Sequence, residues 1–323
     1  MVQQLAKNLI TEAVESRVTD LYFLPLGGDY SVTARKKDSR IPLMTLNQED
    51  YQALLAHFKF LAGMNVGERR RTQVGACSYD YGPGTISLRF STVGDFRNRE
   101  TLVIRLLYDR LEELHFWYED MAKLAKQYSK RGLYLFAGPV GSGKTSLMYR
   151  LAQESFKGSQ ILSIEDPVEI QSDQILQLQV NPEIGLTYDN LIKLSLRHRP
   201  DLLMIGEIRD SQTAHAVIRA SLTGVTVFST IHAKGVKGVY DRMLELGVSK
   251  YELDRSLQGV CYQRLIKGGG LIDFAKEKFK YHSSRQWNQQ VLLLHQEGII
   301  TDEEARKEQI EDAATAEDYS TIS

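Results

Sequence analysis

Residues 132–146 read GLYLFAGPVGSGKTS, an apolar run that breaks into a glycine-rich turn ending in lysine and threonine. Residues 133–137 are expected to form a strand, and residues 146–154 favour a helix. This strand–loop–helix context is what the pattern GxxxxGKT requires to bind a phosphate group. Glycines let the backbone N–H groups turn inward, and the helix N-terminus adds partial positive charge. The stretch therefore predicts a nucleotide site rather than a tight turn that happens to contain a lysine.

The residues of this loop have separate expected roles. Lys144 would reach the β- and γ-phosphates of a nucleotide, and the hydroxyl group of Thr145 would hold Mg²⁺. The residues expected to contact the nucleotide here are Gly138, Pro139, Val140, Gly141, Ser142, Gly143, Lys144, Thr145 and Ser146.

Length and composition limit the class of protein. The chain has 323 residues, enough for two domains, and its 42% hydrophobic and 25% charged residues are ordinary for a globular protein. A net charge of −1 gives no overall attraction to DNA or anionic lipid. Cys77 and Cys261 are isolated, so we expect reduced thiols. The chain shows neither a signal-peptide pattern nor an apolar run of membrane-spanning length, and we expect a soluble protein.

The pattern of apolar residues divides the chain into three expected segments. Residues 1–112 indicate an α+β domain, residues 113–284 an α/β domain with a parallel sheet, and residues 285–323 a helical tail. In the first domain we expect helices at 2–16 and 47–62, and strands at 21–24, 30–35, 41–44, 76–81, 85–91 and 101–107.

The second domain and the tail show helical patterns outside the sheet. A helix at 119–130 is expected to lead into the strand before the glycine loop. After the glycines at 268–270 the pattern becomes helical, with helices expected at 285–296 and 302–311 that pack on their own domain. Residues 319–323 are expected to be disordered.

Four apolar runs of the second domain end in residues suited to binding. The runs are 133–137, 161–164, 202–205 and 225–228, and they lead to the glycine loop, Glu165, Glu207 and His232. An acidic residue after one strand is usually a helix cap. Ligands bind outside the carboxyl ends of parallel strands, so four such ends in succession predict one shared site.

Phosphoryl-transfer chemistry suggests roles for these residues. Glu207 resembles a carboxylate that acts on Mg²⁺ through water, and Glu165 is expected to orient or deprotonate the attacking water. The two assignments could be exchanged. His232 is expected either to sense the γ-phosphate or to be structural.

Arginines would neutralise the negative charge of the transition state. Arg89 and Arg105 lie on adjacent predicted strands of the first domain, where spacing alone indicates solvated side chains. The basic run at 69–71 is likewise a solvated patch, with a salt-bridging or subunit-interface role as the alternative.

Several motifs together resemble the secretion and type IV pilus family of hexameric ATPases, most closely the short competence ATPases of Gram-positive bacteria. The likeness covers about residues 18–267 and is specific because the motifs occur in combination. The matching stretches are LAGMNVGERR at 61–70, the glycine loop at 138–145, SIEDPVE at 163–169 (similar to the Asp box), RHRPD at 197–201 with GEIRD at 206–210 (similar to Walker B), and TGVTVFSTIH at 223–232 (similar to the His box).

This resemblance implies a RecA-like parallel-sheet P-loop ATPase domain preceded by a smaller α+β, PAS-like domain. It implies ATP and Mg²⁺ as cofactors, Arg89 and Arg105 as residues that reach the nucleotide phosphates, and Arg209 as a phosphate or interface residue. The family forms rings of six at the cytoplasmic face of the membrane. ATP turnover there drives a membrane platform protein that inserts or removes pilin subunits, so we expect a motor for assembly of a competence pilus in DNA uptake.

The chain also departs from the family pattern. Val225 replaces a histidine of the His box, and Ala233 and Lys234 replace a common Thr-Asn pair. No Cys-x-x-Cys pairs follow residues 263–265, so we expect no structural zinc. The alternatives are a pilus retraction motor, a nucleotide-gated scaffold with incidental turnover, and a nucleic-acid translocase. The neutral net charge argues against the last, so no direct contact with nucleic acid is expected.

Overall fold

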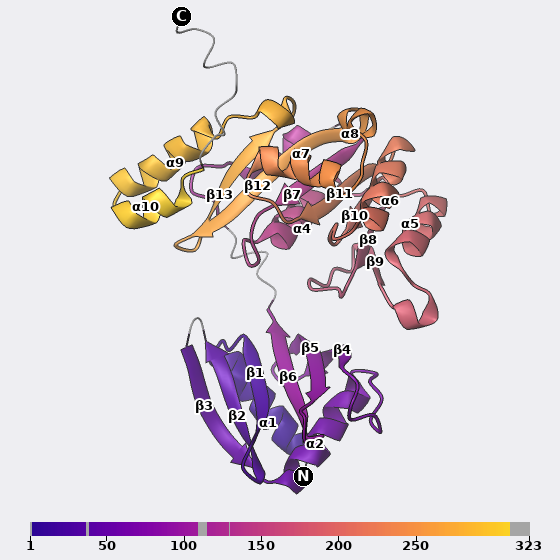
Figure 1. Ribbon diagram of the computed structural model, residues 1–323, viewed down its shortest axis with the longest axis vertical. Helices are drawn as coiled ribbons and strands as arrows, with labels where there is room; N and C mark the ends of the chain where they lie inside the picture. The colour runs from indigo at the N-terminus through magenta and orange to yellow at the C-terminus, as the bar shows by residue number, and fades with distance from the viewer. Residues whose placement is uncertain (1, 37–38, 109–114, 129, 311–323) are drawn as a thin grey trace, which may run out of the picture. The chain divides into compact units, whose positions relative to one another are not determined.

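The computed structural model describes residues 2–36, 39–108, 115–128 and 130–310 (Figure 1). The chain divides into two compact units, Met1–Asp109 and Arg110–Ser323. The expected boundary after residue 112 and the segment 319–323 lie outside the described residues. No described helix has the length and apolar character needed to cross a lipid bilayer.

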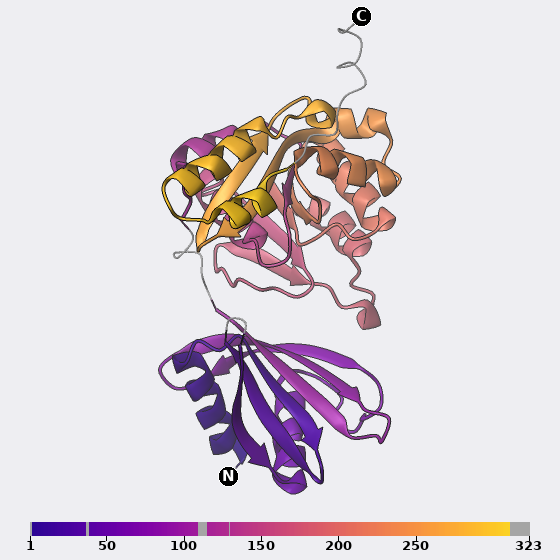
Figure 2. The same ribbon diagram turned by 60° about the vertical axis from the view of Figure 1, so that its left-hand side comes forward.

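The N-terminal unit is a six-stranded antiparallel sheet in the order β3-β2-β1-β6-β5-β4, with helices on one face (Figure 2). Every helix and strand predicted in this unit is present, and most of the strands are longer than predicted. The elements are α1 (Val2–Glu15), β1 (Asp20–Leu26), β2 (Asp29–Lys36), β3 (Ser39–Leu46), α2 (Gln48–Leu61), β4 (Gln73–Asp80), β5 (Thr85–Gly94) and β6 (Glu100–Leu107).

Simple periodicities account for this unit. Helix α1 buries Ala6, Leu9, Ile10 and Ala13, whose spacing places them on one face of the helix. Asn47 caps α2, because its side chain accepts a hydrogen bond from the backbone N–H of residue 50. Alternate residues of β1, β2, β5 and β6 complete the core, so the opposite face of the sheet is left for polar side chains.

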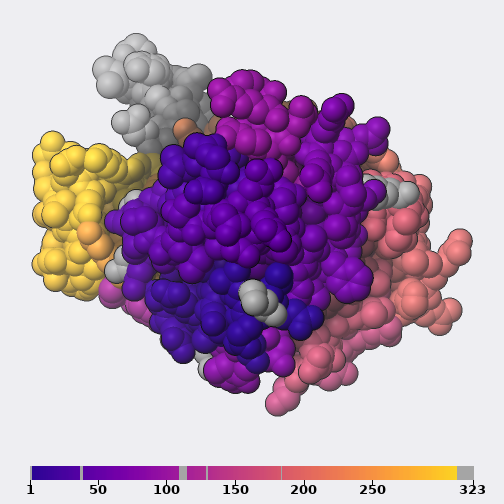
Figure 3. Space-filling view, turned by 90° about the horizontal axis from the view of Figure 1, so that it is seen from below, coloured from indigo at the N-terminus to yellow at the C-terminus, as the bar shows by residue number. Residues whose placement is uncertain are grey.

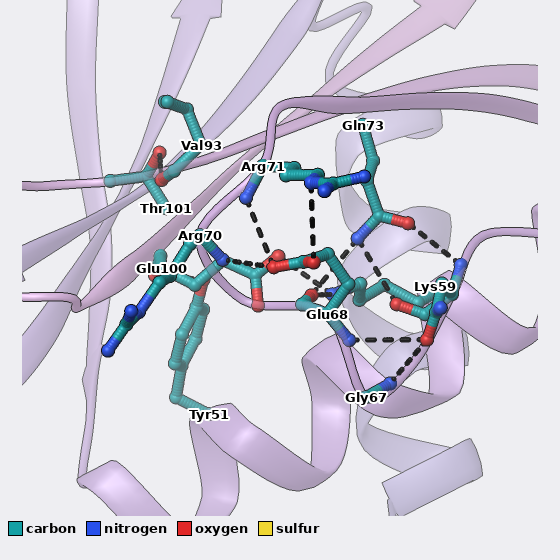
Figure 4. Close-up of polar contacts among 11 residues, drawn as sticks. Tyr51, Lys59, Gly67, Glu68, Arg70, Arg71, Gln73, Val93, Glu100 and Thr101 are labelled. Carbon is teal, nitrogen blue, oxygen red and sulfur yellow. Dashed lines mark hydrogen bonds and ion pairs between the residues drawn. The ribbon is translucent and has the colours of Figure 1, made fainter.

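A buried ion pair lies within this unit (Figure 4). Lys59 and Glu100 are 1% and 2% exposed, and the Lys59 Nζ lies 2.8 Å from the Glu100 Oε1. The same ammonium group donates to the carbonyl oxygen of Glu68 at 2.5 Å. The Glu68 carboxylate in turn accepts the backbone N–H groups of Arg70 and Arg71. Lys59 therefore fixes the loop that presents the exposed basic residues 69–71.

Replacing Lys59 by methionine should destabilise this unit. The Lys59→Met change leaves the Glu100 carboxylate buried without a partner, which is expected to lower the free energy of unfolding by about 3–5 kcal/mol. Urea denaturation followed by circular dichroism measures the loss, and hydrogen exchange of the β6 amides locates it. Lys36→Met, at an exposed lysine of β2, is the control. Equal stability of the two variants would contradict the role given to the ion pair.

The C-terminal unit is built on a seven-stranded sheet in the order β13-β12-β7-β11-β10-β8-β9. All neighbours are parallel except β12 and β13, which form an antiparallel pair. The strands are β7 (Leu133–Ala137), β8 (Ile161–Glu165), β9 (Ile175–Gln179), β10 (Leu202–Ile205), β11 (Thr226–Ile231), β12 (Leu257–Ile266) and β13 (Gly269–Ala275). The helices are α3 (Met121–Ala125), α4 (Lys144–Ser155), α5 (Tyr188–Arg197), α6 (Ser211–Leu222), α7 (Val236–Glu245), α8 (Lys250–Ser256), α9 (Arg285–Gln296) and α10 (Asp302–Glu308).

Helices cover both faces of this sheet. On one face α5 to α10 pack against alternate strand residues such as Leu133 and Leu135. On the other face α3 and α4 pack against the residues between them, Tyr134 and Phe136. The strands of a parallel sheet buried on both sides are mostly apolar, which is why β7, β8, β10 and β11 were recognisable as apolar runs.

Two predictions for this unit need correction. The helix expected at 119–130 is a short α3 followed by a 3₁₀ turn, Lys126–Tyr128, whose Tyr128 ring packs in the core. Strands β9, β12 and β13 were not predicted, and the opening glycines of β13 suggested a break. A Cβ atom on Gly269 would lie 2.4 Å from the Trp117 ring and one on Gly270 2.5 Å from the Phe116 ring. These glycines therefore allow the Phe116 and Trp117 rings to pack closely against β13.

Helices α9 and α10 pack on their own unit, as predicted. Trp287 of α9 is fully buried, and its Nε1 donates to the carbonyl oxygen of Glu308 at 2.7 Å. Asn288 of α9 exchanges two hydrogen bonds with the backbone of Ile310. The two helices form the yellow lobe at the margin of Figure 3. Helix α10 ends at Glu308, before the predicted residue 311, which lies outside the described residues.

Candidate active site

The parallel register brings four strand ends to one edge of the C-terminal sheet. Ile205, the last residue of β10, pairs with Ile164 of β8 and with Ser229 of β11. Strand β11 in turn pairs with β7, which leads directly into the glycine loop. The loop and the residues Glu165, Glu207 and His232 therefore share one edge, as the sequence predicted.

The glycine loop has a backbone suited to an anion. Three glycines of the loop have positive φ angles, which residues other than glycine rarely adopt. The angles are +148° at Gly138, +77° at Gly141 and +82° at Gly143. Helix α4 begins directly after Gly143, which caps it without a side-chain hydrogen bond. The first N–H groups of α4 are thus left for a ligand, and the helix dipole favours one that is negative.

Lys144 lies across the loop. Its Nζ donates to the carbonyl oxygens of Gly138 at 3.0 Å and Pro139 at 2.8 Å. Burial lowers the pKa of Lys144, and the carboxylates of Glu207 and Glu169 oppose this effect. Because phosphate oxygens carry charge, they are stronger acceptors than the two carbonyl groups, so the lysine is placed to bind them.

Glu207 belongs to a polar cluster that touches the loop. Its Oε2 lies 2.7 Å from the Arg209 Nε, and its Oε1 lies 3.1 Å from the His232 Nε2. The other ring nitrogen of His232, Nδ1, lies 3.2 Å from the carbonyl oxygen of Gly138. Both partners of the histidine are acceptors, so the two hydrogen bonds form together only when the ring carries two N–H groups. His232 therefore links the loop to Glu207.

Glu165 has different surroundings, although it lies on the same edge. It is 3% exposed, and its Oε1 accepts hydrogen bonds from the Ser163 hydroxyl at 2.7 Å and from the Tyr149 hydroxyl. Burial raises the pKa of Glu165, and the hydrogen bonds from Tyr149 and Ser163 oppose the rise. A carboxyl group with a raised pKa is a better proton acceptor near neutral pH.

Sequence reasoning overlooked two residues of this site. Glu169 acts electrostatically on both Lys144 and Glu165, raising the pKa of each. Its position within SIEDPVE was the available signal. Tyr149 lies in α4 and gave no signal, because a tyrosine on the buried face of a helix is usually a core residue.

The two predicted arginines belong to the N-terminal unit. Arg89 of β5 and Arg105 of β6 are directly opposite each other in the antiparallel ladder. Like charges in this position are unfavourable, and Asp20 offsets them, because its Oδ1 accepts a hydrogen bond from the Arg105 Nε at 2.8 Å. Their contact with nucleotide remains a prediction.

A cavity of about 840 Å³ lies beside the glycine loop. Gly138, His232, Arg264 and Glu308 contribute to its wall, so the end of α10 forms part of it. Arg264 and Glu308 are 2.9 Å apart and join α10 to β12. Among the described residues no group of three His, Cys, Asp or Glu side chains could hold a metal ion.

Comparisons with known proteins agree with this geometry. The family model described as "Type II/IV secretion system protein" matches residues 1–303. Competence protein ComGA of Streptococcus pneumoniae is 58% identical over 310 residues, 96% of this chain and 99% of that protein. Competence protein ComGA of Bacillus subtilis is 35% identical over 272 residues, 82% of this chain and 76% of that protein.

A solved structure shows the same fold. The pilus retraction motor PilT with bound ADP superposes with a TM-score of 0.73 at 22% identity, covering 94% of this chain and 97% of that one. The predicted class, a RecA-like parallel-sheet domain behind a smaller α+β domain, is confirmed.

Adding one methyl group to the glycine loop should impair nucleotide binding. A Cβ atom on Gly138 would lie 2.2 Å from the Gln263 carbonyl oxygen and 2.6 Å from the Ser142 Oγ, so the loop must move. We expect Gly138→Ala to raise the dissociation constant of a fluorescent ATP analogue by about tenfold or more, equivalent to at least about 1.4 kcal/mol. Fluorescence titration measures this constant.

Gly158→Ala is the matched control for this variant. Gly158 has a positive φ of +78° but open space around it, so its alanine variant carries backbone strain without the clash. Its nucleotide affinity should equal that of the unaltered protein. Unchanged affinity in Gly138→Ala, with the melting temperature retained, would show that the loop does not hold the nucleotide.

Proposed function

The chain belongs to the type II/IV secretion system protein family, and on this basis we propose that it is an ATP-hydrolysing motor that powers assembly of a competence pilus. The observation that carries the proposal is the gathering of Lys144, Glu165 and Glu207 at one sheet edge beside an anion-binding loop. The relative with 58% identity is named a competence protein, which favours this system over others.

Binding of Mg·ATP would use the glycine loop and the start of α4. The backbone N–H groups and Lys144 hold the phosphates, and the hydroxyl group of Thr145 and the carboxylate of Glu207, through water, hold Mg²⁺. The metal ion neutralises charge on the phosphates when it is bound. His232 and Arg209 hold the Glu207 carboxylate in place from either side.

Glu165 is the better candidate for orienting the attacking water. Both oxygens of Glu207 are engaged, one by His232 and one by Arg209. The Oε2 of Glu165 accepts no hydrogen bond from the described part of the chain, while Oε1 accepts two. Glu165 can therefore accept a proton from water at Oε2 as the water attacks the γ-phosphate.

The remaining features of the motor follow the family. We propose a ring of six chains at the cytoplasmic face of the membrane, in which Arg89 and Arg105 neutralise phosphate charge. A membrane platform protein that moves pilin subunits is the proposed partner, with no direct contact to nucleic acid. A retraction motor is the alternative, but the likeness to PilT is one of fold, whereas the relatives that share more sequence are competence proteins.

Loss of either Lys144 or Glu165 should greatly reduce turnover and leave the fold intact. We expect Lys144→Ala and Glu165→Gln to lower the ATPase rate by well over tenfold, because positioned general bases alone contribute about 10²–10⁴-fold. Mass and ATPase rate are measured together, with and without Mg·ATP. Lys157→Ala, at an exposed lysine beyond α4, is the control. A near-normal rate in Glu165→Gln would remove Glu165 from its role, and a monomer in every condition would contradict the ring.

The link to the pilus has its own test. A competent strain that lacks this protein is complemented with the unaltered chain or with Lys144→Ala, and surface pili and transformants are counted. We expect surface pili and transformants only in the strain complemented with the unaltered chain. Normal pilus numbers with Lys144→Ala would favour a scaffold whose turnover is incidental.

A further inference from the structure

We propose that Tyr149 and Gln177 are positioning residues that fix the Glu165 carboxylate for ATP hydrolysis, an inference that rests on the proposed function. The three residues come from three elements: α4, the edge strand β9, and β8 between them in the chain. Gln177 pairs with Ser163, two residues before Glu165 at the end of β8, and none of the sequence motifs contains Tyr149 or Gln177.

The hydrogen bonds run in one direction. The Oε1 of Gln177 accepts the backbone N–H of Ser172 at 2.9 Å, which leaves its Nε2 facing Tyr149. That Nε2 donates to the Tyr149 hydroxyl oxygen at 2.6 Å and to the carbonyl oxygen of Ile170 at 2.7 Å. A tyrosine hydroxyl has one proton. Since Gln177 is the donor in their bond, the tyrosine proton is directed to Glu165, with which it forms a hydrogen bond.

The two donors to Glu165 act on the same oxygen. The hydroxyl groups of Tyr149 and Ser163 both donate to Oε1. Tyr149 is fully buried and Glu165 nearly so, which excludes water as a competing donor on that side. The carboxylate is thus held by one oxygen. This fixes the plane of the carboxylate group and leaves Oε2 oriented for a water molecule.

Burial makes these hydrogen bonds important for the charge of Glu165. Removal from water raises the pKa of Glu165, the nearby Glu169 carboxylate raises it further, and Tyr149, Ser163 and Gln177 lower it. The hydroxyl group of Tyr188, from α5, faces the same region. Burial raises the pKa of Tyr188, and the charge of Glu165 adds to the rise. Glu165 must be ionised to accept a proton, so activity is lost as pH falls through its pKa. Removal of the Tyr149 hydroxyl group should therefore raise the pH at which activity is lost.

The pair also connects the nucleotide loop to the general base. Tyr149 lies on α4, whose first residue is Lys144. Lys144 and Tyr149 therefore belong to one helix, which the Tyr149 hydrogen bond joins to Glu165. Gln177 lies on β9, which pairs with β8, and it holds the Tyr149 hydroxyl group by a hydrogen bond. Glu165 is therefore positioned by α4 through Tyr149 and by β9 through Gln177.

Tyr149→Phe tests the proposal in the assembled, full-length protein with Mg·ATP. We expect kcat to fall by about tenfold, KM to stay within about twofold, and the acidic half-maximum of kcat to move to higher pH. Tyr134→Phe is the matched control, because Tyr134 is also buried and, within the described part of the chain, its hydroxyl group bonds only to the backbone of Lys130. Its kcat and pH profile should match those of the unaltered protein.

Gln177→Met provides the second variant. It is expected to lower kcat by less than Tyr149→Phe, and the double variant should lose less than the sum of the two single losses, because Gln177 donates to the hydroxyl group that Tyr149 uses to hold Glu165. Additive losses, or an unshifted pH profile in Tyr149→Phe at unchanged melting temperature, would overturn the inference. Those results leave the proposed function intact if Glu165→Gln is inactive, whereas absence of ATPase activity in the unaltered protein contradicts the function itself.

Discussion

Parallel pairing of β7, β11, β10 and β8 is the constraint on which this site depends. Parallel strands end at a common edge, so residues more than ninety positions apart, such as Gly138 and His232, come into contact there. Helices cover both faces of the sheet, so most side chains along its strands are apolar. The glycine loop, Glu165, Glu207 and His232 all lie at or just after the ends of these strands. An antiparallel arrangement of the same segments would have sent alternate ends to opposite edges.

Surroundings differentiate the two acids at this edge. Glu207 lies between a guanidinium group and an imidazole ring, so both of its oxygens already have partners. Glu165 is buried, and one of its oxygens accepts both hydrogen bonds from neighbouring side chains. The first arrangement suits a fixed negative charge that supports a metal ion, and the second suits a proton acceptor with a defined orientation. The motifs alone left these two roles exchangeable.

Prediction from sequence succeeded where one local pattern dominated. Helix α1 has four buried residues on one face, and the strands before the glycine loop and the two acids are continuous apolar runs. It failed where distant residues decided the outcome. The glycines that open β13 are required by the rings of Phe116 and Trp117, about 150 residues away. Helix α3 is shorter than its pattern because Tyr128 turns into the aromatic core.

By itself, the sequence determined the glycine loop with its flanking strand and helix, the apolar runs that form β8, β10 and β11, and the two acids at strand ends. Loop chemistry and apolar runs are local properties of the chain, which is why they could be recognised. Only the tertiary structure decided which donors meet Glu165. Tyr149 and Gln177 are 28 positions apart and become neighbours because β9 pairs with β8 beside α4. Hydrogen bonds act over about 3 Å, so their partners are set by packing and register rather than by any pattern along the chain.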